Sequence, residues 1–113
     1  MLQYESSLDA MRDAVLFPIG QALHMVSFKA MKIVPAHYII SKARDRGDLQ
    51  PGKTVVETSS GNFALGMAIV CNRLNHPFVA IGDPAIDPAF KRQLDMLGGR
   101  VEIVTDKKGS QGY

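Results

Sequence analysis

The sequence has 113 residues, of which 46% are hydrophobic, and its 13 Lys+Arg against 11 Asp+Glu give a formal net charge of +2. This length fits one domain, and ordinary apolar content with nearly balanced charge argues against a disordered chain. The weak positive charge, without a run of basic residues, also argues against a nucleic-acid-binding protein.

The single cysteine, Cys71, cannot form an intramolecular disulfide, so it gives no sign of an oxidising compartment. No stretch approaches the roughly 18 consecutive apolar residues of a membrane-spanning helix, and the N-terminus lacks the pattern of a signal peptide. We therefore expect a cytoplasmic protein without a membrane partner. The three histidines have no ligand-like spacing, so no metal site is expected.

Residues 1–27 are expected to form an N-terminal helix and a possible strand that precede the α/β domain. Apolar residues recur at helical spacing over 5–16 and predict a helix there. Residues 22–28 follow a glycine and are a possible strand.

From residue 28 to residue 113 the expected elements alternate between helices and strands. Asp87 followed by Pro88 is typical of a helix N-cap and first position. The helix over 63–74 is apolar on nearly every face, so it is expected to pack on both sides and to bury Cys71 as a structural thiol. The expected elements are helix 35–46, strand 54–57, helix 63–74, strand 78–81, helix 88–97 and strand 101–104.

Alternation of this kind predicts the α/β class. We expect a three-layer open sheet of mostly parallel strands, with right-handed crossovers and helices on both faces. The Val-rich strands fit a sheet that is buried on both sides.

The segment Thr58–Asn62 carries the chemistry, because it follows a strand and opens a helix. Ligands of open α/β sheets bind outside the carboxyl ends of strands, and a helix N-terminus suits an anion. Ser59 and Ser60 add hydroxyl groups, Gly61 allows close approach of the backbone, and Asn62 adds an amide. The pattern indicates a carboxylate or phosphate site, although a plain strand-to-helix turn explains the same residue types equally well.

The segment Glu57–Phe63 resembles the Thr/Ser-Ser-Gly-Asn loop of the cysteine synthase family, the tryptophan synthase beta-like, fold-type II enzymes that use pyridoxal phosphate. The resemblance extends over roughly residues 28–113, and its motifs occur in the order of the family. The further similar segments are 32–40, 47–57, 83–102 and 112–113.

The resemblance implies a catalytic, cofactor-binding lysine that forms a Schiff base with pyridoxal 5'-phosphate. Lys32 occupies that position, at family spacing from Pro35. Lys29 is the alternative, because Ser27-Phe28-Lys29 also resembles the family's Ser-x-Lys approach to the lysine.

The resemblance also implies that Ser59, Ser60, Gly61 and Asn62 bind the substrate carboxylate, and that Asn62 faces the ring hydroxyl of the cofactor. Phe63 belongs to the same substrate-binding loop and stands where many members have threonine.

Two departures from the family matter. Ile33-Val34 replaces the Asp-Arg that follows the family's lysine, and no glycine-rich loop for the cofactor phosphate occurs. We therefore expect residues 28–113 to be the small, substrate-binding domain, with the cofactor-phosphate domain absent.

The implied function is a lyase or transferase of amino-acid biosynthesis that performs pyridoxal phosphate-dependent β-elimination and β-replacement on a small amino acid, present here as a truncated form. The alternatives are a catalytically inactive carboxylate-binding or regulatory module, and one half of a split enzyme. We accordingly expect a homo-oligomer or a complementing subunit.

Overall fold

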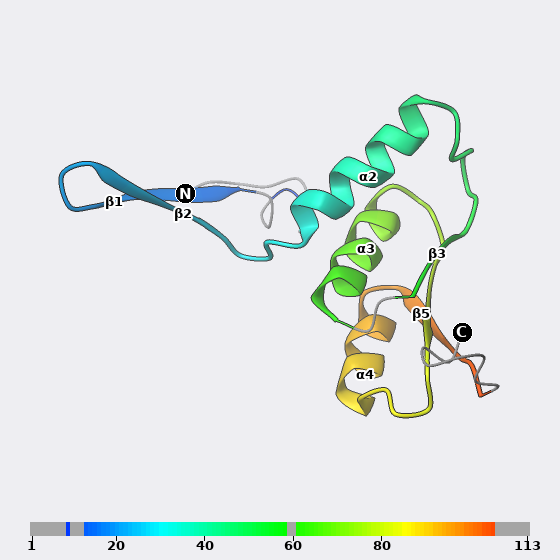
Figure 1. Ribbon diagram of the computed structural model, residues 1–113. Helices are drawn as coiled ribbons and strands as arrows, with labels where there is room; N and C mark the ends of the chain where they lie inside the picture. The colour runs from blue at the N-terminus through cyan, green and yellow to red at the C-terminus, as the bar shows by residue number, and fades with distance from the viewer. Residues whose placement is uncertain (1–8, 10–12, 59–60, 106–113) are drawn as a thin grey trace.

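The computed structural model describes residues 9, 13–58 and 61–105 (Figure 1). Strands β1 (Ala14–Ile19) and β2 (Leu23–Phe28) form an antiparallel hairpin. The turn between them contains Gly20, whose φ of +77° is easily adopted only without a side chain. The hairpin projects away from the rest of the molecule (Figure 1), which gives the chain an elongated shape of 54 × 32 × 26 Å.

The strand expected over 22–28 is confirmed as β2, whereas the helix expected over 5–16 is wrong over residues 14–16, where β1 begins. The rest of that range lies outside the described residues, apart from Asp9 and Asp13. The error has a physical cause. β-Branched and aromatic residues favour strands where they have cross-strand partners, and the spacing of a few apolar residues does not reveal such partners.

The remaining elements alternate as predicted, with boundaries that differ by up to two residues. Strands β3, β4 and β5 form one parallel sheet in that order, with Val55 paired to Phe78 and Phe78 paired to Gly99. The α/β class and the parallel strands are therefore confirmed. The elements are α2 (Ile33–Asp45), β3 (Val55–Glu57), α3 (Asn62–Arg73), β4 (Phe78–Gly82), α4 (Pro88–Met96) and β5 (Gly99–Ile103).

Both crossovers, through α3 and through α4, step across the sheet in the same direction, so both helices lie on one face of it (Figure 1). Phe78 and Ala80 of β4 point toward these helices and are buried in the core. On the opposite face, Val56 is 58% exposed. Within the described residues the sheet thus has helices on one face, not on both as predicted. Helix α2 packs mainly against α3.

The core lies between α2, α3, α4 and the inner face of the sheet. Helix α3 is buried on most of its surface, as its apolar composition predicts, while α2 buries one stripe. The N-cap expected at Asp87 is confirmed, because its Oδ1 accepts a hydrogen bond of 2.9 Å from the Ala89 N–H. The fully buried side chains of largest volume are Ile33, Leu94, Val70 and Cys71.

His76 connects two loops at the amino end of the sheet. Its side chain is 4% exposed, and its Nδ1 lies 2.9 Å from the Lys53 carbonyl oxygen. The Val55 N–H donates to the Pro77 carbonyl oxygen at 2.8 Å, which joins the same two segments. The turn before β3 is therefore fixed to the connection between α3 and β4.

Cys71 is fully buried in α3, as expected, and desolvation raises the pKa of its thiol from 9.0 to about 11. Between these pH values the folded chain holds a proton that the unfolded chain releases. The free energy of unfolding is therefore expected to fall as pH rises from 9 to 11, by up to about 2–3 kcal/mol from this group.

Urea unfolding at pH 8, 9, 10 and 11 measures this effect. Because lysines and tyrosines also titrate there, Cys71→Ala is the control: it lowers stability at every pH but should show a smaller loss between pH 9 and 11. Equal losses in the two proteins would contradict the prediction.

Candidate functional site

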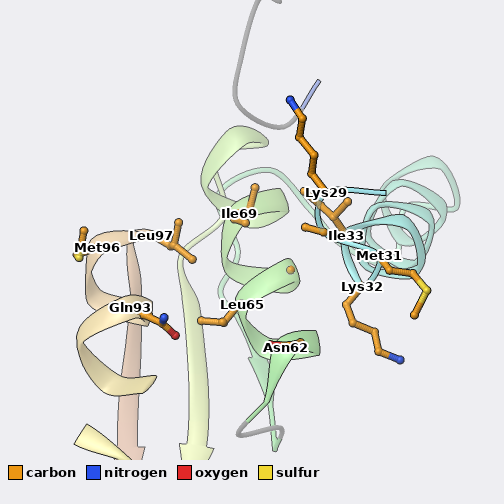
Figure 2. A pocket seen from close by; sticks show the side chains of 12 residues that line it. Lys29, Met31, Lys32, Ile33, Asn62, Leu65, Ile69, Gln93, Met96 and Leu97 are labelled. Carbon is orange, nitrogen blue, oxygen red and sulfur yellow. The ribbon is translucent and has the colours of Figure 1, made fainter. Parts of the chain in front are cut away.

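A cavity of about 460 Å³ lies between the segment that precedes α2, one face of α3 and the end of α4 (Figure 2). This volume is within the range of small-molecule sites. Both candidate lysines, Lys29 and Lys32, line it together with Asn62. The fold thus brings into one cavity groups that lie about thirty positions apart in the sequence.

The charge of the cavity favours an anion. Two of its lining residues are lysines, and none of the described residues that line it is acidic. Its remaining wall is mostly apolar, with Leu65 and Ile69 from α3 and Met96 from α4. An apolar cavity with a few polar groups at one side is typical of sites that bind small molecules.

Lys32 is the N-cap residue of α2, but its side chain does not cap the helix. The first N–H groups of the helix are satisfied by the preceding turn, because Ile33 N–H donates to the Ala30 carbonyl oxygen at 3.0 Å and Val34 N–H donates to the Met31 carbonyl oxygen at 3.2 Å. The Lys32 amine is therefore not required to stabilise the start of α2.

The two lysines leave the chain in opposite directions (Figure 2). In this view the Lys32 side chain runs down to the level of Asn62, with its tip turned away from α3, and the Lys29 side chain runs in the other direction. This geometry favours Lys32 over Lys29 as the lysine that acts together with Asn62.

Asn62 is the first residue of α3 and follows Gly61, the N-cap residue, whose backbone is extended. The Ala64 N–H donates to the Gly61 carbonyl oxygen at 3.0 Å. The N–H groups of Asn62 and Phe63 precede this bond and have no acceptor within the helix. Asn62 thus places an amide side chain at the positive end of a helix dipole, where an anion is stabilised.

Of the carboxylate loop expected over 59–63, the structure describes only residues 61–63. Ser59 and Ser60 lie outside the described residues. Of the others, Asn62 lines the cavity, whereas Gly61 is exposed beside it and Phe63 packs against the hydrophobic core.

Sequence reasoning predicted Asn62 but missed the cavity wall that α4 and the later residues of α3 contribute. Gln93 and Met96 lie on α4, whereas the lysines lie between β2 and the start of α2, and no local pattern relates the two segments. Gly66 had a signal, because a glycine inside a helix is unfavourable and suggests a packing reason.

Comparison with known proteins identifies the family. Residues 21–112 match the family model described as pyridoxal-phosphate dependent enzyme. The chain belongs to this family. The resemblance to cysteine synthase-like, fold-type II enzymes is therefore confirmed.

Relatives with known names are considerably longer. The chain is 38% identical over 84 residues to N-(2-amino-2-carboxyethyl)-L-glutamate synthase of Ralstonia nicotianae, covering 74% of this chain and 25% of that protein. The fold is similar to that of O-ureido-L-serine synthase, with a TM-score of 0.75 and 21% identity over 97% of this chain and 38% of the other. It is also similar to that of a hydrogen sulfide-producing enzyme from Fusobacterium nucleatum, with a TM-score of 0.77 and 16% identity. This match covers 97% of this chain and 39% of the other.

The residues of the cavity fit one end of the family's cofactor. A primary amine at Lys32 suits the aldehyde of pyridoxal phosphate, the amide of Asn62 suits a ring hydroxyl, and the two lysines complement an anionic molecule. Among the described residues, none forms a glycine-rich loop at this cavity for the phosphate group.

Two further classes of site receive no support from the described residues. No group of three or more His, Cys, Asp or Glu side chains there is arranged to hold a metal ion. No helix in the described ranges is both long and apolar enough to cross a membrane.

Proposed function

We propose that this chain supplies the lysine-bearing, substrate-binding part of a pyridoxal phosphate-dependent enzyme that performs β-elimination and β-replacement on a small amino acid. The observation that carries the proposal is that Lys32 and Asn62 line the same cavity. When bound, the cofactor withdraws electrons from the α-carbon of the amino acid.

The chain's own residues have distinct roles in this proposal. The Lys32 amine binds the aldehyde of the cofactor and, once displaced, takes and returns the proton at the substrate's α-carbon. The N-terminus of α3 and the Asn62 amide hold the substrate carboxylate. The apolar wall formed by Leu65 and Ile69 excludes water from this region.

The name of the Ralstonia relative supports β-replacement as the reaction class. It describes a glutamate whose nitrogen carries a 2-amino-2-carboxyethyl group. That group is an alanine skeleton joined through its β-carbon, which is the product expected when an amine replaces a leaving group at that carbon. An amino-acid amine is therefore the nucleophile class that we propose for this chain.

The test is covalent labelling of the 113-residue chain. Pyridoxal phosphate is added, the visible absorption band of the lysine-bound cofactor is recorded, and borohydride reduction is followed by peptide mapping. We expect one dominant label, at Lys32. Labels spread over many lysines, in both the native and the urea-unfolded chain, would contradict a specific site.

The exposed hairpin supports a proposal about partners. Leu16 is 64% exposed and Leu23 is 61% exposed, and an isolated two-stranded hairpin is marginally stable in water. Its two faces are both mainly apolar. We propose that the hairpin is covered by a complementing polypeptide, which also holds the cofactor phosphate.

A binding experiment tests this partner. The rest of the Ralstonia relative is expressed separately and mixed with the chain, and complex formation is followed by sedimentation velocity. We expect a complex that Leu16→Asp with Leu23→Asp abolishes, while urea unfolding of the α2–β5 part is unchanged. A discrete dimer of the chain alone would instead indicate a homo-oligomer.

A further inference from the structure

Gly66 marks a very close contact between α3 and the first residues of α2. A Cβ atom at this position would lie 3.0 Å from the Lys32 carbonyl oxygen, 3.1 Å from the Lys32 carbonyl carbon and 3.2 Å from the Ile33 nitrogen. All three are backbone atoms. Such distances are shorter than ordinary van der Waals contact, so any side chain at Gly66 requires the backbone of Lys32 to move.

At the other closely packed glycines, a Cβ atom would meet side-chain atoms and not the backbone. A Cβ atom at Gly82 would meet the Cδ1 atom of Ile86 at 2.8 Å, which is the end of a flexible side chain. Ile86 can adopt another rotamer, whereas the carbonyl group of Lys32 is held within the first turn of α2, where it accepts a hydrogen bond of 3.3 Å from the Ala36 N–H.

Gly66 is also related to the other end of the candidate site. It lies four residues after Asn62 on α3, so the two residues occupy the same face of the helix. The contact between Gly66 and the Lys32 backbone therefore helps to set the distance between the Lys32 backbone and Asn62. Glycine is unfavourable inside a helix, and the absence of a side chain at this contact explains its presence here.

We propose that Gly66 is a positioning residue, which holds the backbone of Lys32 against α3 so that the lysine amine and the Asn62 amide meet one cofactor. This inference rests on the proposed function, because it assumes that Lys32 binds pyridoxal phosphate. It assigns to Gly66 a role that acts through Lys32 and not by contact with the cofactor.

Titration with pyridoxal phosphate compares the wild-type chain, Gly66→Ala and the control Gly82→Ala. We expect Gly66→Ala to raise the apparent dissociation constant at least tenfold and to reduce labelling of Lys32. Gly82→Ala introduces a methyl group whose conflict the Ile86 side chain can relieve, at a residue that does not line the cavity, and it should bind as the wild type does. Equal affinity of Gly66→Ala and the wild type, with both chains folded, would overturn the inference.

Amide hydrogen exchange without cofactor separates positioning from a direct obstruction of the cavity. The Ala36 N–H reports on the Lys32 carbonyl oxygen, its acceptor. We expect it to be protected in the wild type and to exchange at least tenfold faster in Gly66→Ala but not in Gly82→Ala. Unchanged exchange in Gly66→Ala would show that the methyl group only obstructs the cavity and would overturn the inference.

Amide exchange at Ala36 also gives a decision if Gly66→Ala does not fold or if the wild type binds no pyridoxal phosphate. If Gly66→Ala does not fold, rapid exchange of the Ala36 N–H in the wild type would show that α3 does not fix the start of α2, and slow exchange would support that it does. If the wild type binds no pyridoxal phosphate at Lys32, the proposed function fails, while the exchange rates still decide whether Gly66 positions this backbone.

Discussion

Lys32→Ala is expected to abolish covalent attachment of pyridoxal phosphate, whereas Lys29→Ala should retain it. Both lysines line the cavity, but in Figure 2 only the Lys32 side chain runs along α3 in the direction of its N-terminal end, whereas Lys29 runs the opposite way. An alanine offers neither an amine for the aldehyde nor a group that moves a proton. If the complementing polypeptide that we propose yields an active enzyme, the loss of proton transfer alone should lower its kcat by about 10²–10⁴-fold.

Lys32→Arg is the matched control for charge, because arginine keeps the positive charge and cannot form the bond to the aldehyde. We expect Lys32→Arg to bind the cofactor reversibly, without the absorption band of the lysine-bound form. The readouts are the visible spectrum and mass spectrometry after borohydride reduction. Retained attachment in Lys32→Ala, lost in Lys29→Ala, would assign the role to Lys29 instead.

Local signals in the sequence predicted most of the α/β part. Asp87 and Pro88 fix the start of α4 through a contact two residues away, so the sequence around them contains the whole cause. The apolar composition of α3 likewise predicted its burial, because a helix without a polar face has no side to expose.

Features that depend on distant residues were not predictable in the same way. Strand β1 exists because Phe17 and its neighbours pair with β2, and helical spacing within one segment does not report on such pairing. The placement of α3 and α4 on one face follows from the order of β3, β4 and β5, which no single segment specifies.

Part of the candidate site was predictable from local motifs, and part of it depends on residues that are distant in the sequence. Motif resemblance indicated Lys32 and Asn62, and the structure places both at one cavity. It did not indicate the wall from α4, because that wall arises when two separate crossovers pack side by side. Nor did it explain why Ile33-Val34 follows the lysine, for which the structure supplies a reason: Ile33 is fully buried in the core, and Val34 is exposed.

This difference between neighbours leads to a second prediction of large effect. Ile33→Ala is expected to lower the free energy of unfolding by about 2–5 kcal/mol, because it removes a fully buried side chain and leaves a cavity between α2 and α3. Val34→Ala, at a residue that is 41% exposed, should change it by no more than about 0.5 kcal/mol. Since small domains are stable by about 5–15 kcal/mol, the first change is a large fraction of the total.

Urea unfolding of the two variants and the wild type measures the difference. Equal losses of unfolding free energy in the two variants would show that Ile33 does not hold α2 against the core. The outcome also bears on the lysine. Because Ile33 is the residue after Lys32 and its side chain lies in the core, its burial helps to hold the lysine's backbone against α3, next to the Gly66 contact. Ile33→Ala should therefore weaken pyridoxal phosphate binding in the fraction that remains folded, and Val34→Ala should not. A departure from the family's residues after the lysine then has a structural role, since a buried aliphatic residue fixes the start of α2 in this chain.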